Sequence, residues 1–132
     1  MLHLIKLCVG CDSIEDLAEW QRKRAPLEHW TRSHPKRAEE ILDGGSLYWV
    51  IKGQIRVRQR ILGLERREDE EGAWCAILLG RRLTRLRPRA QRPFQGWRYL
   101  ETEDAPPDLA KGEKAEELPE KLAAELRALG LL

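Results

Sequence analysis

Two adjacent strand-forming segments constrain the fold of this 132-residue chain more than any other feature. Residues 46–52 (SLYWVIK) carry aromatic and β-branched side chains, which suit a pleated, half-buried surface. After a Gly-Gln turn, residues 55–61 (IRVRQRI) alternate apolar and polar side chains, which is the period of a strand with one buried face. The sequence therefore predicts an antiparallel hairpin in which Ile55, Val57 and Ile61 face a core.

Other segments with strand character flank this hairpin. Residues 3–9 are predicted to be a strand, and residues 73–79 a central strand because they are apolar on both faces. Residues 81–92 contain Pro88 and are followed by Pro93, which favours an edge strand or an extended loop. Residues 94–100 are predicted to be a closing strand. The almost wholly charged stretch 65–72 is interpreted as a connection between strands.

Two helices are predicted before the hairpin. Ser13 and Asp16 have the spacing of a capping box, and the helix that they begin should end near Pro26. Pro35 is expected to be the first residue of the second helix, where a missing N–H costs nothing. The buried stripe of that helix is expected to be Ala38, Ile41 and Leu42.

The composition is typical of a soluble globular protein, with 42% hydrophobic and 35% charged residues. The longest apolar run is far shorter than the roughly 20 residues of a membrane-spanning helix, and the N-terminus lacks the apolar stretch of a signal peptide. We therefore expect a cytoplasmic protein with no membrane partner. We predict one α+β domain over residues 1–100, with a small, strongly bent, mostly antiparallel sheet flanked by two helices. Residues 101–132 are interpreted as an acidic linker and an amphipathic C-terminal helix over residues 118–129.

Charge is distributed unevenly along the chain, although the net charge is only +2. Residues 20–98 hold 19 basic and 9 acidic side chains, whereas the segments before and after them are acidic. Of the 24 basic residues 17 are arginine, whose planar guanidinium pairs bidentately with phosphate. This distribution favours an anionic partner for the central part of the chain.

The candidate phosphate-binding residues lie on the second strand of the hairpin and its turn. Arg56, Arg58 and Arg60 are predicted to share the solvent face of that strand, with Lys52 beside them. Such a row can follow a phosphate backbone and gives affinity without sequence choice. The alternative is that arginine on an exposed strand provides solubility and blocks edge pairing. The row would be extended by Arg81, Arg82, Arg85, Arg87, Arg89 and Arg92.

Aromatic side chains could hold a base beside this row. Tyr48, Trp49 and Trp97 are the candidates, together with Tyr99, because stacking of a base on an aromatic ring contributes about 1–3 kcal/mol. Packing in the core is the alternative for each of them. Tyr48 and Trp49 point to opposite faces of their strand, so at most one of them is expected to face a ligand.

Cys8 and Cys11 form a C-x-x-C motif, and Cys11 lies just before a predicted helix N-terminus, which lowers thiol pKa. A redox pair, part of a zinc site and a buried small side chain are the open interpretations. A zinc site would need two further ligands, and the only candidates are Cys75 and the three histidines. We assign no metal and no cofactor from this pattern.

His29 and His34 flank Arg32 in the segment before the second helix, a position where binding residues often lie. A general base would also need a nucleophile or a carboxylate partner, and only Asp43 and Ser46 are plausible. We assign no catalytic residue, and whether the protein is an enzyme stays open.

Four strings, LIKLCVGCDSIEDLAEW, PKRAEEILDGGSLYWVIKGQI, RQRIL and FQGWRYL, resemble a bacterial family described as domain of unknown function 1489, over about residues 2–109. The order of a short helix ending in glycine, a strand with Tyr-Trp and a basic strand is similar to PUA-like barrels, including the ASCH and EVE domains. That resemblance implies a PUA-like β-barrel and a partner that is RNA or a modified base. Residues 44–47 (GGSL) replace the Gly-x-Lys pattern of ASCH domains, so no catalytic lysine is transferred.

Three functional hypotheses follow from these patterns. The first is binding of RNA or another nucleic acid through the basic strand face and an aromatic pocket. The second is a protein-interaction or self-association module, in which the acidic C-terminal helix docks on the basic face of its own chain or of a neighbouring subunit. The second case would give a homo-oligomer. The third is an enzyme acting on a modified nucleotide, whose mark would be a pocket joining Trp49, Asp43 and a basic residue.

Overall fold

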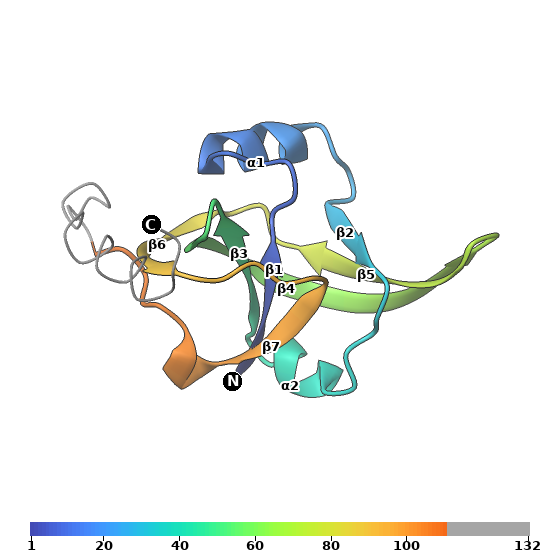
Figure 1. Ribbon diagram of the computed structural model, residues 1–132. Helices are drawn as coiled ribbons and strands as arrows, with labels where there is room; N and C mark the ends of the chain where they lie inside the picture. Colours follow the sequence, from blue (N-terminus) through green and yellow to red (C-terminus); the bar gives the residue numbers. More distant parts are fainter. Residues whose placement is uncertain (111–132) are drawn as a thin grey trace.

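The computed structural model describes residues 1–110, which form a mostly-β fold with two short α-helices (Figure 1). The elements are β1 (Leu2–Leu7), α1 (Ile14–Arg22), β2 (Glu28–Thr31), α2 (Ala38–Leu42), β3 (Ser46–Ile51), β4 (Gln54–Asp69), β5 (Gly72–Leu79), β6 (Thr84–Ala90), β7 (Trp97–Glu101) and a 3-10 turn (Thr102–Asp104). The strand order is β2-β5-β4-β3-β1-β7, and β6 pairs with β4. The sheet is open, and it is mixed because β1 and β3 are parallel whereas the other pairs are antiparallel. Within residues 1–110, no helix has the length and apolar character needed to span a bilayer.

The predicted hairpin is confirmed as β3 and β4, with one irregularity in its register. Trp49 pairs with Val57, but its neighbour Val50 pairs with Ile55, so Arg56 is an extra residue in β4. The extra residue shifts the alternation of side chains, and Ile55 and Val57 therefore pack in two different apolar clusters. The prediction that Ile55 shares a buried face with Val57 is wrong for this reason.

The charged stretch after the hairpin is not a separate connection. Strand β4 continues through it to Asp69 and pairs with β5 along its whole second half, so the interpretation as a connection is wrong. Charged side chains form ion pairs on this pair of strands: Arg67 bonds Glu65 at 2.8 Å and Glu28 of β2 at 3.3 Å. The β4–β5 ribbon extends away from the rest of the molecule (Figure 1). β5 lies between β4 and β2, as predicted for a central strand.

Helix α1 begins at the predicted capping box. The Ser13 hydroxyl accepts the Asp16 backbone N–H at 3.1 Å, and the Asp16 carboxylate accepts the Asp12 backbone N–H at 2.9 Å. Its inner face buries Ile14, Leu17 and Gln21. The helix is therefore fixed at its start by local hydrogen bonds and along its length by the core.

Helix α2 is shorter than the sequence predicts. It begins at Ala38, three residues after Pro35, so the placement of Pro35 at its first position is wrong. Ile41 is fully buried, but Leu42 is 40% exposed and does not belong to the buried stripe. A helix of 5 residues makes little more than one turn, so only one of its faces reaches the sheet.

Apolar clusters lie on both faces of the sheet. The cluster on the helix side contains Leu4, Leu17, Ile41 and Trp49, and the opposite cluster contains Tyr48 and its neighbours. Among the described strands, β6 pairs with β4 alone and β7 pairs with β1 alone, so both lie at the margins of the sheet. This agrees with the prediction of an edge strand for the proline-containing segment and of a closing strand for residues 94–100. Residues 107–109 run along β6, and the helix predicted over residues 118–129 lies outside the described residues.

Candidate functional site

The cations of the predicted phosphate-binding row do not share one face. Arg58 faces residues 101–110, where its Nε and Nη2 donate to the two oxygens of Asp108 at 2.7 and 2.8 Å. Arg56 faces α1, since its charge acts on Glu15. Lys52 lies 3.8 Å from Asp12, just before α1. The bulge at Arg56 is the cause, because it turns neighbouring arginines to different sides of the sheet.

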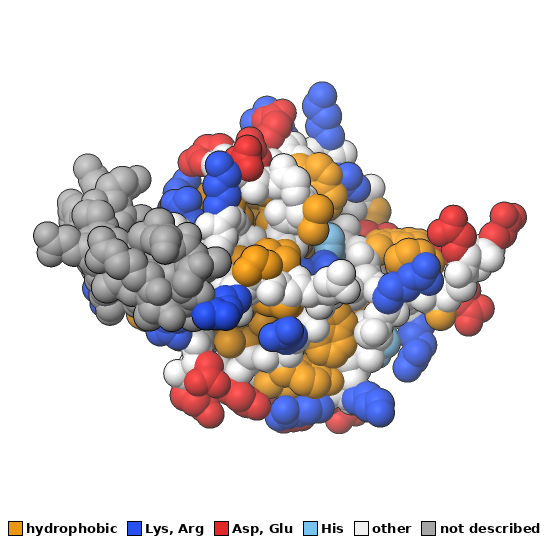
Figure 2. Space-filling model, in the orientation of Figure 1, with side chains coloured by type: hydrophobic (Ala, Val, Ile, Leu, Met, Phe, Trp, Pro, Cys, Tyr) orange, Lys and Arg blue, Asp and Glu red, His pale blue; other side chains and the backbone are white. Residues whose placement is uncertain are grey.

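Carboxylates neutralise part of this basic surface. The pKa of the Glu15 carboxyl is lowered chiefly by its hydrogen bond with Arg85, and the pKa of Asp108 is lowered by its hydrogen bonds with Arg58. Lys and Arg side chains are scattered among acidic ones around the margin of the face seen in Figure 2, while hydrophobic side chains lie in its middle. The number of arginines alone therefore does not locate a binding site.

The predicted aromatic residues are placed in three different environments. Trp49 is 1% exposed and Tyr48 is 5% exposed, on opposite faces of β3. Trp97 is partly buried on β7, where its Nε1 donates to the Ser33 carbonyl at 2.8 Å and its ring meets the edge of Tyr99. Trp97 and Tyr99 have rings partly open to solvent, whereas the buried Trp49 can act on a ligand only as the floor of a cavity.

Such a cavity lies beneath α1, and we call it the α1 pocket. Its volume is about 490 Å³, and it is bounded by α1, the end of β1, and single side chains of β2 and β3. The residues that give it chemical character are Lys6, Cys8, Cys11, Trp20, His29 and Trp49. Asp16 and Glu19 of α1 also line it.

A buried polar network holds α1 over the pocket floor. The Gln59 side-chain oxygen accepts the Trp49 indole N–H at 2.8 Å and the Gln21 amide at 2.9 Å. The Gln59 amide in turn donates to Gln21 at 2.8 Å and to the Gly80 carbonyl at 3.0 Å. Because each of these groups is satisfied, the network fixes the position of the helix relative to β3 and β4.

Lys6 is the cation inside the α1 pocket. Burial lowers the pKa of its ammonium, and among residues 1–110 no carboxylate lies within ion-pair distance of it. On β1 it occupies the same face as Leu2 and Leu4, which are in the core. A partly buried ammonium without a counter-ion is unfavourable unless something anionic or a hydrogen-bond acceptor meets it.

His29 forms the wall of the pocket opposite α1. Burial, with smaller contributions from the charges of Lys6 and Arg24, lowers its pKa to about 4, so its imidazole is neutral near pH 7. Its Nε2 is buried and has no hydrogen-bond partner within residues 1–110. The ring contacts Trp20 and Trp49 edge-on, with centroids 6.2 and 5.1 Å apart. The pocket therefore combines three aromatic rings with one cation.

Trp20 lies at the mouth of the pocket and is 42% exposed. The Arg24 guanidinium is stacked on its ring at 3.9 Å from the centroid. Arg81 donates to the backbone carbonyls of Gln21 and Arg24, which brings a second guanidinium to the same end of the helix. Cations at a helix C-terminus stabilise it, and here they also place positive charge beside the pocket.

The C-x-x-C motif forms part of the pocket wall as a disulfide between Cys8 and Cys11. The Cys8 N–H donates to the Val50 carbonyl at 2.9 Å, which fixes the end of β1. Cys75 is buried, and burial raises the pKa of its thiol. Within residues 1–110, no three His, Cys, Asp or Glu side chains come together as ligands of a metal would.

The other predicted chemical groups lie elsewhere. His34 bonds the carbonyl of Pro35, and Asp43 follows α2, so Asp43 does not line the α1 pocket with Trp49. Sequence reasoning missed Lys6 and Trp20 as site residues. Lys6 could have been found, because the alternation of β1 puts a lysine on its buried face, whereas the approach of Trp20 to His29 depends on the tertiary fold.

A family model described as protein of unknown function (DUF1489) matches residues 4–132. No curated protein and no solved structure matches the chain. The resemblance to PUA-like barrels therefore stays a prediction.

Proposed function

The chain belongs to the family described as protein of unknown function (DUF1489), and we propose that it binds RNA or another nucleic acid and holds one unstacked base in the α1 pocket. One observation carries the proposal. The ammonium of Lys6, without a carboxylate partner among residues 1–110, lies in a cavity whose walls include three aromatic rings.

The size and the lining of the α1 pocket suit a base. Its volume of about 490 Å³ lies in the range of about 300–1,000 Å³ that is common for small-ligand sites. Trp20 and His29 offer ring surfaces, and stacking of a base on such a ring contributes about 1–3 kcal/mol. The buried Trp49 forms the floor of the pocket and does not offer a stacking surface.

The polar groups of the pocket suit the edge of a base. The Lys6 ammonium is a donor for a carbonyl oxygen or a ring nitrogen, and it can equally meet a phosphate. A neutral His29 imidazole has one donor and one acceptor nitrogen. Proteins recognise single-stranded RNA by the same combination of stacking and contacts to the edge of an unstacked base.

The charge of the chain supports a nucleic acid over an uncharged small molecule. Residues 20–98 carry ten more basic than acidic side chains, and Arg24 and Arg81 lie beside the pocket. We also propose that the fold is an α+β domain with a strongly bent sheet or a PUA-like barrel. The resemblance to PUA-like barrels implies RNA or modified bases as ligands. Lys52, Arg56 and Arg60 are proposed to add phosphate contacts, whereas Arg58 is held by Asp108.

The test is a titration of the full chain with single-stranded and structured RNA at several salt concentrations. Binding should weaken linearly on a log–log plot against salt, because cations that contact phosphates release counter-ions. Trp20→Ala should weaken binding about 5- to 100-fold, the range that corresponds to loss of one stacked base. Lys6→Met should also weaken binding and should leave the fold intact, since it removes an unpaired cation.

Trp30→Ala is the matched control for Trp20→Ala. Trp30 is 40% exposed, close to the exposure of Trp20, but it does not line the α1 pocket. Affinity should be unchanged in this variant. Absence of binding to every RNA at low salt, or equal loss in the two tryptophan variants, would overturn the proposal.

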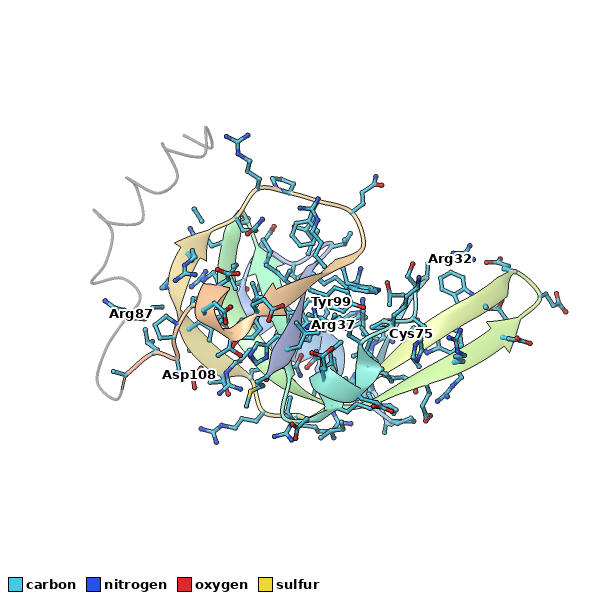
Figure 3. All side chains as sticks on the ribbon, turned by 90° about the horizontal axis from the view of Figure 1, so that it is seen from below. Arg32, Arg37, Cys75, Arg87, Tyr99 and Asp108 are labelled. Atoms are coloured by element: carbon cyan, nitrogen blue, oxygen red, sulfur yellow. A yellow bond between two sulfur atoms is a disulfide. The ribbon has the colours of Figure 1, made fainter. Side chains whose placement is uncertain are left out.

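A second candidate function is self-association, in which acidic residues near the C-terminus dock on a basic face of this chain or of a second copy. The observation that favours it is the contact of residues 101–110 with β4 and β6, above all the two hydrogen bonds between Arg58 and Asp108. Figure 3 shows Asp108 and Arg87 together at this side of the sheet. The same contact exchanged between two copies would give a homo-oligomer.

A further inference from the structure

A second hollow lies on the same face of the sheet as the α1 pocket, and we call it the β7 groove. Its volume is about 480 Å³, and it is formed by the last residue of β2 with the segment after it (residues 31–36) and by β7 with the turn before it. The charged and aromatic side chains that are placed to contact a ligand are Arg32, Lys36, Trp97 and Tyr99. The hydrogen bond from Trp97 Nε1 to the Ser33 carbonyl, 2.8 Å long, holds the two walls together.

The two hollows are neighbours through the strand pairing. Lys6, which lines the α1 pocket, is the cross-strand partner of Trp97, which lines the β7 groove. Side chains of directly opposite residues have Cβ atoms about 4.5–5.5 Å apart and lie on one face. His29 and Thr31 repeat this relation along β2, since they are two residues apart and line one hollow each. The two hollows therefore adjoin each other at Lys6 and Trp97.

The β7 groove has the two kinds of side chain that bind a nucleotide without sequence choice. Trp97 and Tyr99 form an aromatic pair with centroids 5.0 Å apart, and part of the Tyr99 ring is open to solvent. Arg32 and Lys36 have no carboxylate partner among residues 1–110, and the Arg32 guanidinium is stacked on Trp74. Stacking rings beside cations are the usual features of single-strand binding surfaces.

Arg37 is close to this groove but is not available to a phosphate. Its guanidinium bonds both oxygens of Glu40, at 2.6 and 2.8 Å, and lies 3.4 Å from Glu101. In Figure 3, Arg37 and Tyr99 lie next to each other, and Arg32 lies farther out beside the β4–β5 ribbon. The free positive charge of the groove therefore comes from Arg32 and Lys36.

We propose that the β7 groove binds the nucleotide adjacent to the base held in the α1 pocket, so that the ligand is a single strand with at least two successive unstacked nucleotides. Its base stacks on Trp97 or Tyr99, and Arg32 and Lys36 contact its phosphate. This inference rests on the proposed function, because it assumes that the α1 pocket holds a base. It adds the class of ligand, which is an unpaired strand rather than a free nucleotide or a duplex.

The experiment compares nucleoside monophosphates with dinucleotides and tetranucleotides of uridine and of adenosine. Affinity should rise about tenfold or more from mononucleotide to dinucleotide, since one further base stacks. The gain should be lost in the variant Arg32→Ala/Lys36→Ala, and the salt slope for the tetranucleotide should fall by about 0.7, because the two side chains contact one phosphate and each neutralised phosphate contributes about 0.7. Trp97→Leu should reduce the gain with length as well.

Arg98→Ala is the control for the loss of charge. Arg98 is an exposed arginine of the same strand, but it pairs with Ile5 and stacks on Phe94, and both of these belong to the cluster on the opposite face. Its variant should keep both the gain with length and most of the salt slope. If mononucleotides bind and longer strands bind no better, the groove proposal is wrong while the α1 pocket stands. If no length binds, both are wrong.

Discussion

The α1 pocket and the arginine-rich strands β4 and β6 contain positive charge of two different kinds. On these strands, Arg58 and Arg85 each have a carboxylate partner, Asp108 and Glu15. In the α1 pocket, Lys6 is partly buried and has no such partner among residues 1–110. An ion pair on the surface contributes little to stability, and its charges are already neutralised. An unpaired charge in a cavity is unfavourable, and a ligand that carries an anion or a hydrogen-bond acceptor reduces that cost. Pairing, rather than the number of cations, distinguishes the two regions.

The largest expected effect concerns the floor of the pocket. Trp49→Ala should lower the free energy of unfolding by about 3–5 kcal/mol, because it removes a fully buried indole and one of the two donors to the Gln59 side-chain oxygen. Denaturant unfolding followed by circular dichroism measures this loss. Trp30→Ala, which removes an exposed indole, should change stability by no more than about 0.5 kcal/mol. Equal effects would contradict the role of Trp49 as the buried support of the pocket floor.

The second prediction concerns the wall of the pocket and its pH dependence. The pKa of His29 is about 4 in the folded chain, below its ordinary 6.5, because burial opposes protonation. The unfolded chain therefore binds the proton first, and stability should fall by about 2 kcal/mol as the pH drops from 7 to 5. Charges that face this imidazole are Lys6 and Arg24, with Asp16 and Glu19 lining the same pocket.

Unfolding midpoints at pH 7 and pH 5 check this prediction. His29→Gln should remove most of the loss, and His34→Gln should keep it. A smaller loss should remain in His29→Gln, since burial also lowers the pKa of His3. An unchanged loss in His29→Gln would show that the acid sensitivity of the chain does not come from the α1 pocket.

The smallest expected effect concerns the ion pair between Arg58 and Asp108. Asp108→Asn should lower stability by no more than about 1 kcal/mol, because the pair with Arg58 is partly exposed. The same change releases the Arg58 guanidinium, so RNA should bind a few-fold more tightly and the salt slope should rise by about 0.7. A change in the mass of the protein in solution, without a change in RNA binding, would instead support self-association.

Local patterns predicted those elements whose cause is local. The capping box of α1 and the β3–β4 hairpin depend on residues close in sequence, and both are confirmed. The extra residue at Arg56 could not be predicted, because strict alternation continues through it in the sequence while the pairing with β3 and β6 shifts. The extension of β4 was missed because its charges are satisfied across strands by Glu28, a residue distant in sequence.

The candidate site was predicted less well than the fold. Three of its features, the closeness of Trp20 to His29, the lack of a partner for Lys6 and the pairing of Lys6 with Trp97, arise from four separate strands and helices. Trp97 was chosen from its residue type and does line a hollow, but Tyr48 is buried on the far face of β3. Composition identifies candidate side chains, and only the packing shows which of them meet.

The segment after β7 also closes off one border of the sheet. The Arg87 N–H donates to the Pro107 carbonyl at 3.0 Å, and the Leu109 N–H donates to the Arg85 carbonyl at 2.9 Å, so residues 107–109 shield the outer backbone of β6. A strand with an unshielded backbone is a template on which another polypeptide can add. Through these two bonds the acidic segment also protects the protein against uncontrolled aggregation.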